Sequence, residues 1–401
     1  MIKVRLSFLL LFAAATVFHN AAAQNIVPDR ANVQYALVDG ISLRLDLYFP
    51  KNTAKPYPVI VWVHGGGWSA GSKANPRAEF LVSHGYAVAS INYRLSDQAK
   101  FPAQLYDCKA AIRWLRANAV QYDLDPKRIG AFGSSAGGHL VALLGTTAGV
   151  DSLEGKVGGN LQFSSEVQAV CDWYGPTDFL TICNYPSNIN HCAANSPEAE
   201  LIGGSIQANR AKAIAASPIT YVGKGDPPFL IMHGTLDMTV PFQQSVTMDS
   251  ALRRSGGIVV FKPIIGGGHG DSAFEADSTK LPVVAFFDRY VKTLLTAIDN
   301  ERSEVVATFH LAQNYPNPFN PATSIKFALP HPAQVQLRIF DVHGREIVTL
   351  IDNEVLPVGQ HVRDWEARTQ ASGVSKVSSE LRELNSTATN DDDAKPGHHQ
   401  V

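Results

Sequence analysis

The chain has 401 residues, of which 45% are hydrophobic and 17% are charged, and its formal net charge at pH 7 is −2. This length exceeds what one hydrophobic core usually serves, so it predicts a folded protein with two domains and accessory segments. The near-neutral charge gives no reason to expect nucleic acid or an anionic membrane surface as a partner, and neither is predicted.

The N-terminal segment has the pattern of a secretory signal peptide. Lys3 and Arg5 precede an apolar stretch over 6–18 that is too short to span a bilayer, and alanines at 21–23 offer a small-residue cleavage site. A buried N-terminal helix is the alternative. We expect residues 1–23 to be removed and the protein to be secreted, to an extracellular or cell-surface location. No other segment is apolar enough for membrane insertion.

Export permits disulfide bonds, and the chain has four cysteines. Cys183 and Cys192 bracket a polar loop that they could close, but the sequence alone leaves their pairing with each other or with Cys108 and Cys171 open. No spacing of cysteine and histidine resembles a zinc site, so neither a metal nor another cofactor is expected.

From residue 33 onward, strand-like and helix-like segments alternate. The expected strands cover 33–38, 41–50, 57–67, 86–95, 167–175, 228–237 and 259–270, with a strand, a turn and a helix together over 128–144. The other expected helices cover 78–85, 101–125, 239–256 and 281–298. Asp39-Gly40 is a hairpin turn signal between the first two strands. This alternation predicts an α/β fold, with a mostly parallel sheet flanked by helices, in a domain over 24–299.

The pattern changes after a linker expected over 300–308. Segments of strand length, separated by proline, glycine and His-Gly turns, cover 324–330, 333–341, 345–352 and 359–367. They predict a small all-β sandwich over 309–374. The remaining residues, 375–401, are rich in serine, asparagine and aspartate, and we expect them to be disordered.

The stretch Gly133-Ser134-Ser135-Ala136-Gly137 fits a nucleophile elbow between a strand and an apolar helix. A nucleophile must stand clear of the sheet, and a sharp turn that achieves this crowds the neighbouring backbone. Glycines two positions before and after the apex relieve that crowding. The pattern therefore predicts Ser135 as the catalytic nucleophile, while Ser134 is expected to fit beneath the turn.

A serine hydroxyl needs a base, and that base must be oriented by an acid. In the chain order expected for an elbow serine, the acid comes next and the base follows near the end of the domain. Asp237 and His269 occupy those places, each after a predicted strand. Asp172 and Asp178 are alternative acids, although they follow a strand that comes one position too early.

The segment HGGGW at 64–68 follows a buried strand and leaves backbone N–H groups open to close approach. Gly66, Gly67 and Ala136 are the expected oxyanion-hole donors. Aromatic residues that either line a substrate pocket or pack in the core are Trp68, Trp173 and Tyr174. Polar residues expected to have structural roles are His64, Arg94, His139, His233 and Asp271.

Taken together, HGGGW, NYRL at 92–95, GSSAGG, DWYGPTDF at 172–179, HGTLDMTVP and GGGHG resemble the esterases of the α/β-hydrolase fold. The resemblance covers about 33–297 and is strongest to the HGGG-bearing branch, which includes hormone-sensitive-lipase-like enzymes and bacterial acetyl and feruloyl esterases. Unlike the hormone-sensitive-lipase-like enzymes, the chain has only about forty mature residues before HGGG. The resemblance therefore implies a cap that is small or is built from 151–166 and 179–216.

Residues 310–374 are similar to the C-terminal sorting domains of type IX secretion substrates. The similarity rests on HLAQNYPNPFNPATSIKFALP, FDVHGREIVTL and LPVGQHVRDWEA, and it breaks off after Gly373-Val374. It implies secretion machinery as a partner of this region.

These motifs predict a secreted serine carboxylesterase that forms an acyl-enzyme. The resemblance favours acetyl or feruloyl groups on plant polysaccharide, with a small ester or an acylated oligosaccharide as substrate. The alternatives are a broad-specificity lipase or esterase, a polyester hydrolase, a peptidase and, in another class, a carbohydrate-binding or adhesion protein that works through the sandwich.

Overall fold

The computed structural model describes residues 27–292 and, later in the chain, 310–311, 314, 322–329, 333–341, 343, 345–356, 359–366 and 378–384. The chain divides into two units, Met1–Leu294 and Leu295–Val401, and each is described separately below. The predicted signal peptide and linker lie outside the described residues.

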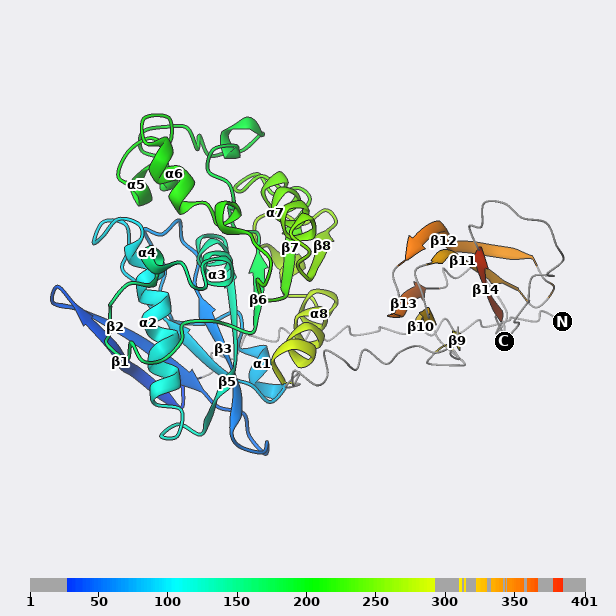
Figure 1. Ribbon diagram of the computed structural model, residues 1–401, viewed down its shortest axis with the longest axis horizontal. Coiled ribbons are helices and arrows are strands. Elements are labelled where there is room, and N and C mark those ends of the chain that lie inside the picture. Colours follow the sequence, from blue (N-terminus) through cyan, green and yellow to red (C-terminus); the bar gives the residue numbers. More distant parts are fainter. Residues whose placement is uncertain are drawn as a thin grey trace, which may run out of the picture. The chain divides into compact units, whose positions relative to one another are not determined.

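An eight-stranded sheet forms the centre of the first unit (Figure 1). Its strands are β1 (Arg30–Val38), β2 (Ile41–Tyr48), β3 (Tyr57–Val63), β4 (Ala87–Ile91), β5 (Leu124–Ser134), β6 (Ala169–Trp173), β7 (Phe229–Gly234) and β8 (Val259–Ile264). They lie in the order β1-β2-β4-β3-β5-β6-β7-β8. All neighbours from β4 to β8 are parallel, whereas β2 pairs antiparallel with both β1 and β4. The prediction of a mostly parallel sheet is confirmed.

The hairpin between β1 and β2 turns at the expected residues. Asp39 and Gly40 have φ angles of 50° and 80°. Positive φ at both central residues is the requirement of a type I′ turn, whose twist matches that of the two strands.

Helices cover both faces of the sheet. The α-helices are α1 (Phe80–Ser83), α2 (Ala103–Ala117), α3 (Ala136–Thr146), α4 (Asp151–Glu154), α5 (Pro197–Ile202), α6 (Arg210–Ala216), α7 (Gln243–Arg254) and α8 (Asp277–Phe287). Short 3₁₀ turns lie at Ile182–Asn184, Pro218–Tyr221 and Ser272–Phe274, and a π-helical turn over Asp288–Lys292 follows α8. Among the described residues, no helix is long and apolar enough to cross a bilayer.

The alternation of side chains along β3 separates two hydrophobic cores. Val59, Val61 and Val63 point into the core that α2, α3 and α7 cover. Ile60 and Trp62 point into the opposite core, which α1 and α8 cover. A central strand that is apolar at every position therefore serves both faces, as a doubly covered parallel sheet requires.

Several predicted elements are shorter than expected, including the helix over 101–125 and the strand over 86–95. The helix expected over 101–125 ends at Ala117, because Leu124 instead starts β5 and pairs with Tyr57. The strand expected over 86–95 ends at Ile91. Beyond it, the buried Arg94 donates from Nη2 to Asp107 Oδ1 of α2 at 2.7 Å, so the chain turns towards that helix. The expected buried ion pair of Arg94 is confirmed.

The second unit is a small sandwich of two antiparallel sheets. Its strands are β9 (His310–Leu311), β10 (Ala322–Leu329), β11 (Ala333–Phe340), β12 (Glu346–Leu356), β13 (Gly359–Glu366) and β14 (Ser378–Leu384). The sheets have the orders β13-β10-β9 and β12-β11-β14. Ile325 and Phe327 of one sheet share a core with Val335, Leu337 and Ile351 of the other.

Strand β14 corrects the expectation of disorder throughout 375–401. Residues Ser378–Leu384 pair antiparallel with β11, on the side that β12 leaves open. An unpaired strand edge presents backbone donors and acceptors that another segment can use. Because such pairing depends on a partner distant in sequence, the polar composition of this segment gave no sign of it.

Candidate active site

Ser135 stands at a sharp turn between β5 and α3. Its φ and ψ angles are 55° and −123°, and its N–H donates to the Trp173 carbonyl oxygen at 2.8 Å. A Cβ on Gly133 would collide with the carbonyl oxygen of Gly137, and a Cβ on Gly137 would collide with that of Val63. Both glycines are therefore required by close backbone contacts, as the elbow interpretation predicts.

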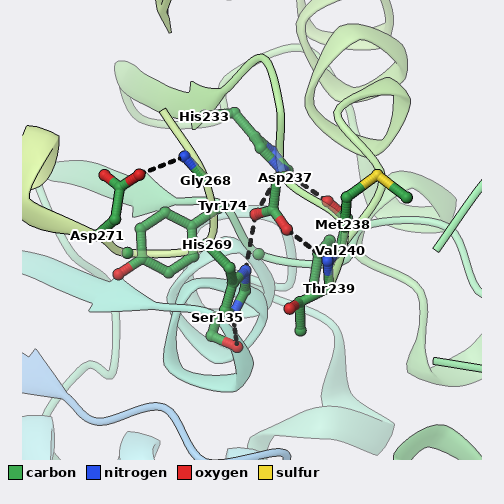
Figure 2. Close-up of polar contacts among 12 residues, drawn as sticks. Ser135, Tyr174, His233, Asp237, Met238, Thr239, Val240, Gly268, His269 and Asp271 are labelled. Carbon is green, nitrogen blue, oxygen red and sulfur yellow. Dashed lines mark hydrogen bonds and ion pairs between the residues drawn. The ribbon is translucent and has the colours of Figure 1, made fainter. Parts of the chain in front are cut away.

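The structure brings Ser135, His269 and Asp237 into one hydrogen-bonded line (Figure 2). His269 Nε2 lies 2.9 Å from Ser135 Oγ, and His269 Nδ1 lies 2.7 Å from Asp237 Oδ2. The three residues follow β5, β7 and β8, whose carboxyl ends meet at one edge of the sheet. In this arrangement the imidazole can take the proton from the serine hydroxyl while the carboxylate holds the ring.

Asp237 is held as a carboxylate by several donors. Its Oδ1 accepts from the N–H groups of Thr239 and Val240 at 2.7 and 2.9 Å. Burial opposes ionisation, but hydrogen bonds and charge from His233 and His269 hold the pKa of Asp237 below its ordinary value. The acid therefore stays negative and can stabilise a positively charged His269.

His233 has the expected structural role, and it also contacts the acid. Its Nδ1 lies 2.7 Å from Ser245 Oγ, and its Nε2 lies 2.9 Å from the Val240 carbonyl oxygen and 3.2 Å from Asp237 Oδ2. With a proton on Nε2 the ring can donate towards both the Val240 carbonyl oxygen and the Asp237 carboxylate, while Nδ1 shares a hydrogen bond with the Ser245 hydroxyl. His233 thus supports the side of Asp237 that His269 does not occupy.

Residues outside the recognised motifs fix the loop that carries His269. Asp271 accepts from the N–H groups of Gly268 and Ala273 at 2.6 and 3.0 Å. Arg77 donates to the Gly270 carbonyl oxygen at 2.8 Å and to the Tyr174 hydroxyl at 2.6 Å. The sequence predicts Asp271 as a structural residue of this loop. It does not indicate Arg77, because Arg77 is part of no recognisable local motif.

Hydrogen bonds and ring stacking hold the HGGGW loop in place. Tyr93 donates from its hydroxyl to the His64 carbonyl oxygen at 3.0 Å, and the two rings stack with centroids 4.4 Å apart. The N–H of Ser96 donates to the Trp68 carbonyl oxygen at 2.8 Å. Burial lowers the pKa of His64 to about 4, so this ring is neutral near pH 7. His64 thus supports the loop, as expected.

The expected oxyanion-hole residues line the same cavity as Ser135. Gly66 and Gly67 have φ angles of 109° and 56°, which suit glycine, and Ala136 is the first residue of α3. N–H groups in the first turn of a helix have no intrahelical acceptor, so that of Ala136 is available to a ligand. Donation by these three residues to an oxyanion stays a prediction.

The cavity beside Ser135 has a volume of about 390 Å³. Its wall includes Pro176, Ile189, His191, Pro197 and Glu198 from the segment that follows β6. That segment is joined by a disulfide between Cys183 and Cys192, the pairing that the sequence left open. No residue of 151–166 is among those that line this cavity, and α4 in that segment packs on α2. The cap expected from two insertions is therefore built from one of them.

The three aromatic candidates divide between cavity and core. Trp68 and Tyr174 line the cavity. Trp173 does not line it, because its side chain points into the opposite core and packs on Phe132 and Phe274 with ring centroids 4.8 and 5.2 Å away. The substrate-binding role predicted for Trp173 is wrong, and its packing alternative holds. Trp173 is the last residue of β6, whereas Tyr174 follows the strand with a φ of 46° and places its ring 4.7 Å from that of His269.

Trp68 is also tied to a buried histidine. Its Nε1 donates to His139 Nδ1 at 3.2 Å, and His139 Nε2 lies 2.7 Å from the Ala216 carbonyl oxygen. Burial lowers the pKa of His139 to about 4, so the ring is neutral and accepts from the indole. His139 therefore has the expected structural role.

The two alternative acids have other partners. Asp172 Oδ1 accepts from the Gly175 N–H at 2.9 Å, and burial raises the pKa of this carboxyl to about 7. Asp178 accepts from the Leu180 N–H at 3.0 Å and from the Thr181 hydroxyl at 2.8 Å. The carboxylate in contact with His269 is that of Asp237. Within the described part of the chain, no group of three or more His, Cys, Asp or Glu side chains could hold a metal ion.

A model of the family described as BD-FAE matches residues 45–252, which include Ser135 and Asp237. The chain is 34% identical over 206 residues to a protein named esterase LipQ from Mycobacterium tuberculosis, and the match covers 51% of this chain and 47% of that protein. The chain spans about half the length of the curated relatives that it matches.

Two solved structures are also similar. One is described as a truncated form of carbohydrate esterase from gut microbiota, with a TM-score of 0.62, 36% identity, and coverage of 68% of this chain and 99% of that chain. The other is described as a bifunctional GH43-CE of Bacteroides eggerthii, with a TM-score of 0.60, 40% identity, and coverage of 65% and 35%. These similarities confirm the predicted α/β-hydrolase fold.

We expect Asp172 to make the stability of the protein depend on pH. Its folded pKa of about 7 exceeds the ordinary 3.8, so the folded state keeps a proton that the unfolded state releases. The resulting stabilisation is complete below about pH 4 and is lost as the pH rises to about 7. Between pH 4 and pH 8, the free energy of unfolding should therefore fall less in Asp172→Asn than in the wild type. The difference between the two decreases should be about 2 kcal/mol or more, measured by urea titration at each pH.

The exposed Asp97 provides the matched control for this measurement. Asp97→Asn should follow the wild-type curve. Parallel curves for the wild type and Asp172→Asn would contradict the expectation.

Proposed function

We propose that the whole protein is a secreted serine carboxylesterase. The chain belongs to the BD-FAE family, and its first unit is a carboxylic ester hydrolase of the α/β-hydrolase fold. Its proposed substrates are short-chain or aromatic acyl esters, in particular acetyl or feruloyl groups on plant polysaccharide. The single observation that carries the activity is the contact line from Ser135 through His269 to Asp237.

In the proposed mechanism, Ser135 Oγ attacks the ester carbonyl carbon while His269 Nε2 takes the hydroxyl proton. Asp237 keeps the ring oriented and stabilises its positive charge. The N–H groups of Gly66, Gly67 and Ala136 would donate to the oxyanion, and each such donor is typically worth about 3 kcal/mol in the transition state. His269 then gives the proton to the leaving alcohol, and a water molecule repeats the sequence to release the acid.

Two findings support a carbohydrate ester as the substrate. The two similar structures are described as a carbohydrate esterase and a GH43-CE, at 36% and 40% identity. The cavity of about 390 Å³ is also of the size that holds a small molecule, and its wall includes polar side chains such as His191 and Glu198. A broad-specificity esterase is the second candidate, because a curated relative is named simply as an esterase.

Secretion is supported by three features. The N-terminal pattern is that of a signal peptide, the Cys183–Cys192 disulfide suits an oxidising compartment, and the second unit contains the small sandwich expected of a sorting domain. We propose that this sandwich serves export through the type IX machinery and takes no part in turnover.

Ser135→Ala should abolish hydrolysis of 4-nitrophenyl acetate, by about 10⁴-fold or more in kcat, because no other group in the contact line can form the acyl-enzyme. The measurement is the release of 4-nitrophenol, with circular dichroism to show that the fold is intact. Ser152→Ala, at an exposed serine on α4, is the matched control and should keep full activity. Full activity in Ser135→Ala would refute the proposed nucleophile.

The substrate proposal predicts release of acetate or ferulate from xylan fragments at rates at least comparable with those on simple esters. A series of 4-nitrophenyl esters should show its maximum at short acyl chains, because the proposed substrates carry short-chain or aromatic acyl groups. A maximum at about ten carbons or more would instead favour a lipase.

Truncation after residue 308 should leave esterase turnover unchanged and prevent appearance of the protein in the medium of a host with type IX secretion. The full chain is the control, and mass spectrometry should place the mature N-terminus at Gln24. Loss of sugar binding on truncation would favour the carbohydrate-binding alternative, and unchanged export would exclude the sorting role.

A further inference from the structure

A buried pair of ionisable side chains lies in the cavity wall and takes no part in the triad. His191 Nδ1 lies 2.9 Å from Glu198 Oε1, and the two side chains are only 2% and 3% exposed. Both residues line the cavity that contains Ser135. Buried charges are costly, so a pair in this position requires partners for its polar atoms.

Every polar atom of His191 has such a partner. Nδ1 faces Glu198, and Nε2 lies 3.0 Å from the Thr239 carbonyl oxygen and 3.2 Å from Ser187 Oγ. Burial disfavours the charged ring, but the hydrogen bond and charge of Glu198 hold the pKa of His191 above its ordinary value. His191 therefore acts as a donor to Glu198 and fixes one of its two oxygens.

The second oxygen of Glu198 has no partner. Among the described residues, Glu198 Oε2 is buried and accepts no hydrogen bond. A buried carboxylate oxygen without a donor costs free energy, and an ordered water or a molecule bound in the cavity that this residue lines would supply the donor. An ionised carboxylate can only accept, so the missing partner must carry an O–H or N–H group.

The backbone around Glu198 is held in place before any ligand binds. Ser196 caps α5 by accepting from the Ala199 N–H at 3.1 Å, and Pro197 occupies the first turn of that helix. The Pro197 Cβ would lie 3.5 Å from a Cβ on Gly67, so α5 starts directly beside the oxyanion loop. The disulfide at Cys192 fixes the chain next to His191.

We propose that Glu198 is a specificity-determining residue, whose free Oε2 accepts a hydrogen bond from a hydroxyl group of the bound ester. This inference rests on the proposed function. It adds that the cavity wall at Glu198 recognises esters that carry a hydroxyl group. The hydroxyl has two possible sources: a sugar hydroxyl on the alcohol side of the ester, or a phenolic hydroxyl on the acyl side.

The test combines one variant with matched substrates. Glu198→Gln keeps the size of the side chain and removes its charge. One substrate pair is methyl p-coumarate and methyl cinnamate, which differ in the phenolic hydroxyl. The other is a mono-acetylated methyl xyloside and its deoxy analogues, which lack single ring hydroxyls. Glu200→Gln, at an exposed glutamate of the same helix, is the control variant.

We expect Glu198→Gln to lower kcat/KM by about tenfold or more on the hydroxylated member of one pair and by less than about twofold on its partner. The pair that shows this coupling identifies the source of the hydroxyl. Circular dichroism and the melting temperature of Glu198→Gln, compared with those of the wild type, show whether the variant is folded. Glu200→Gln should behave as the wild type on every substrate.

Two outcomes would overturn the proposal. The first is an equal loss on both members of each pair, which would make Glu198 a structural residue. The second is no loss on any substrate.

Binding of the acetylated xyloside to Ser135→Ala and to Ser135→Ala/Glu198→Gln, measured by calorimetry, provides a readout without turnover. Absence of hydrolysis by the wild type would therefore refute the proposed function, while equal affinities in the two proteins would separately refute the hydroxyl site.

Discussion

The active site depends on the close crossing of two backbone segments where β5 becomes α3. Gly133 and Gly137 approach the opposing carbonyl oxygens so closely that neither position has room for a Cβ. The same turn holds Ser135 at a φ of 55°, which is unfavourable for a residue with a side chain and is maintained by its surroundings. The sheet therefore fixes the nucleophile through the backbone, so that its hydroxyl is free to contact His269.

The acid of the triad connects the site to the cavity wall. Asp237 accepts from the Thr239 N–H, while the Thr239 carbonyl oxygen faces His191, which in turn contacts Glu198. One short loop thus joins the groups that orient the base to the groups that contact a ligand. A change at Glu198 can therefore reach Asp237 through three hydrogen bonds, so the matched substrates are needed to separate an effect on the triad from an effect on ligand binding.

Residues in local motifs could be placed from the sequence, whereas residues with distant partners could not. Ser135, Asp237 and His269 each follow the end of a strand, in the chain order that is expected for an elbow serine. Arg77 contacts Gly270 from a loop without periodicity, and strand β14 pairs with β11 despite a polar composition. Trp173 and Tyr174 pack in the same core, and only Tyr174 also lines the cavity, a difference between neighbouring aromatic residues that no sequence pattern indicates.

His269 follows β8, the last strand of the eight and an edge strand that pairs only with β7. A chain that has folded up to β7 holds its serine and its carboxylate but has no imidazole between them. Of the three triad residues, His269 is therefore the one whose place depends on an edge strand, so displacement of β8 would remove the base and leave Ser135 and Asp237 in position.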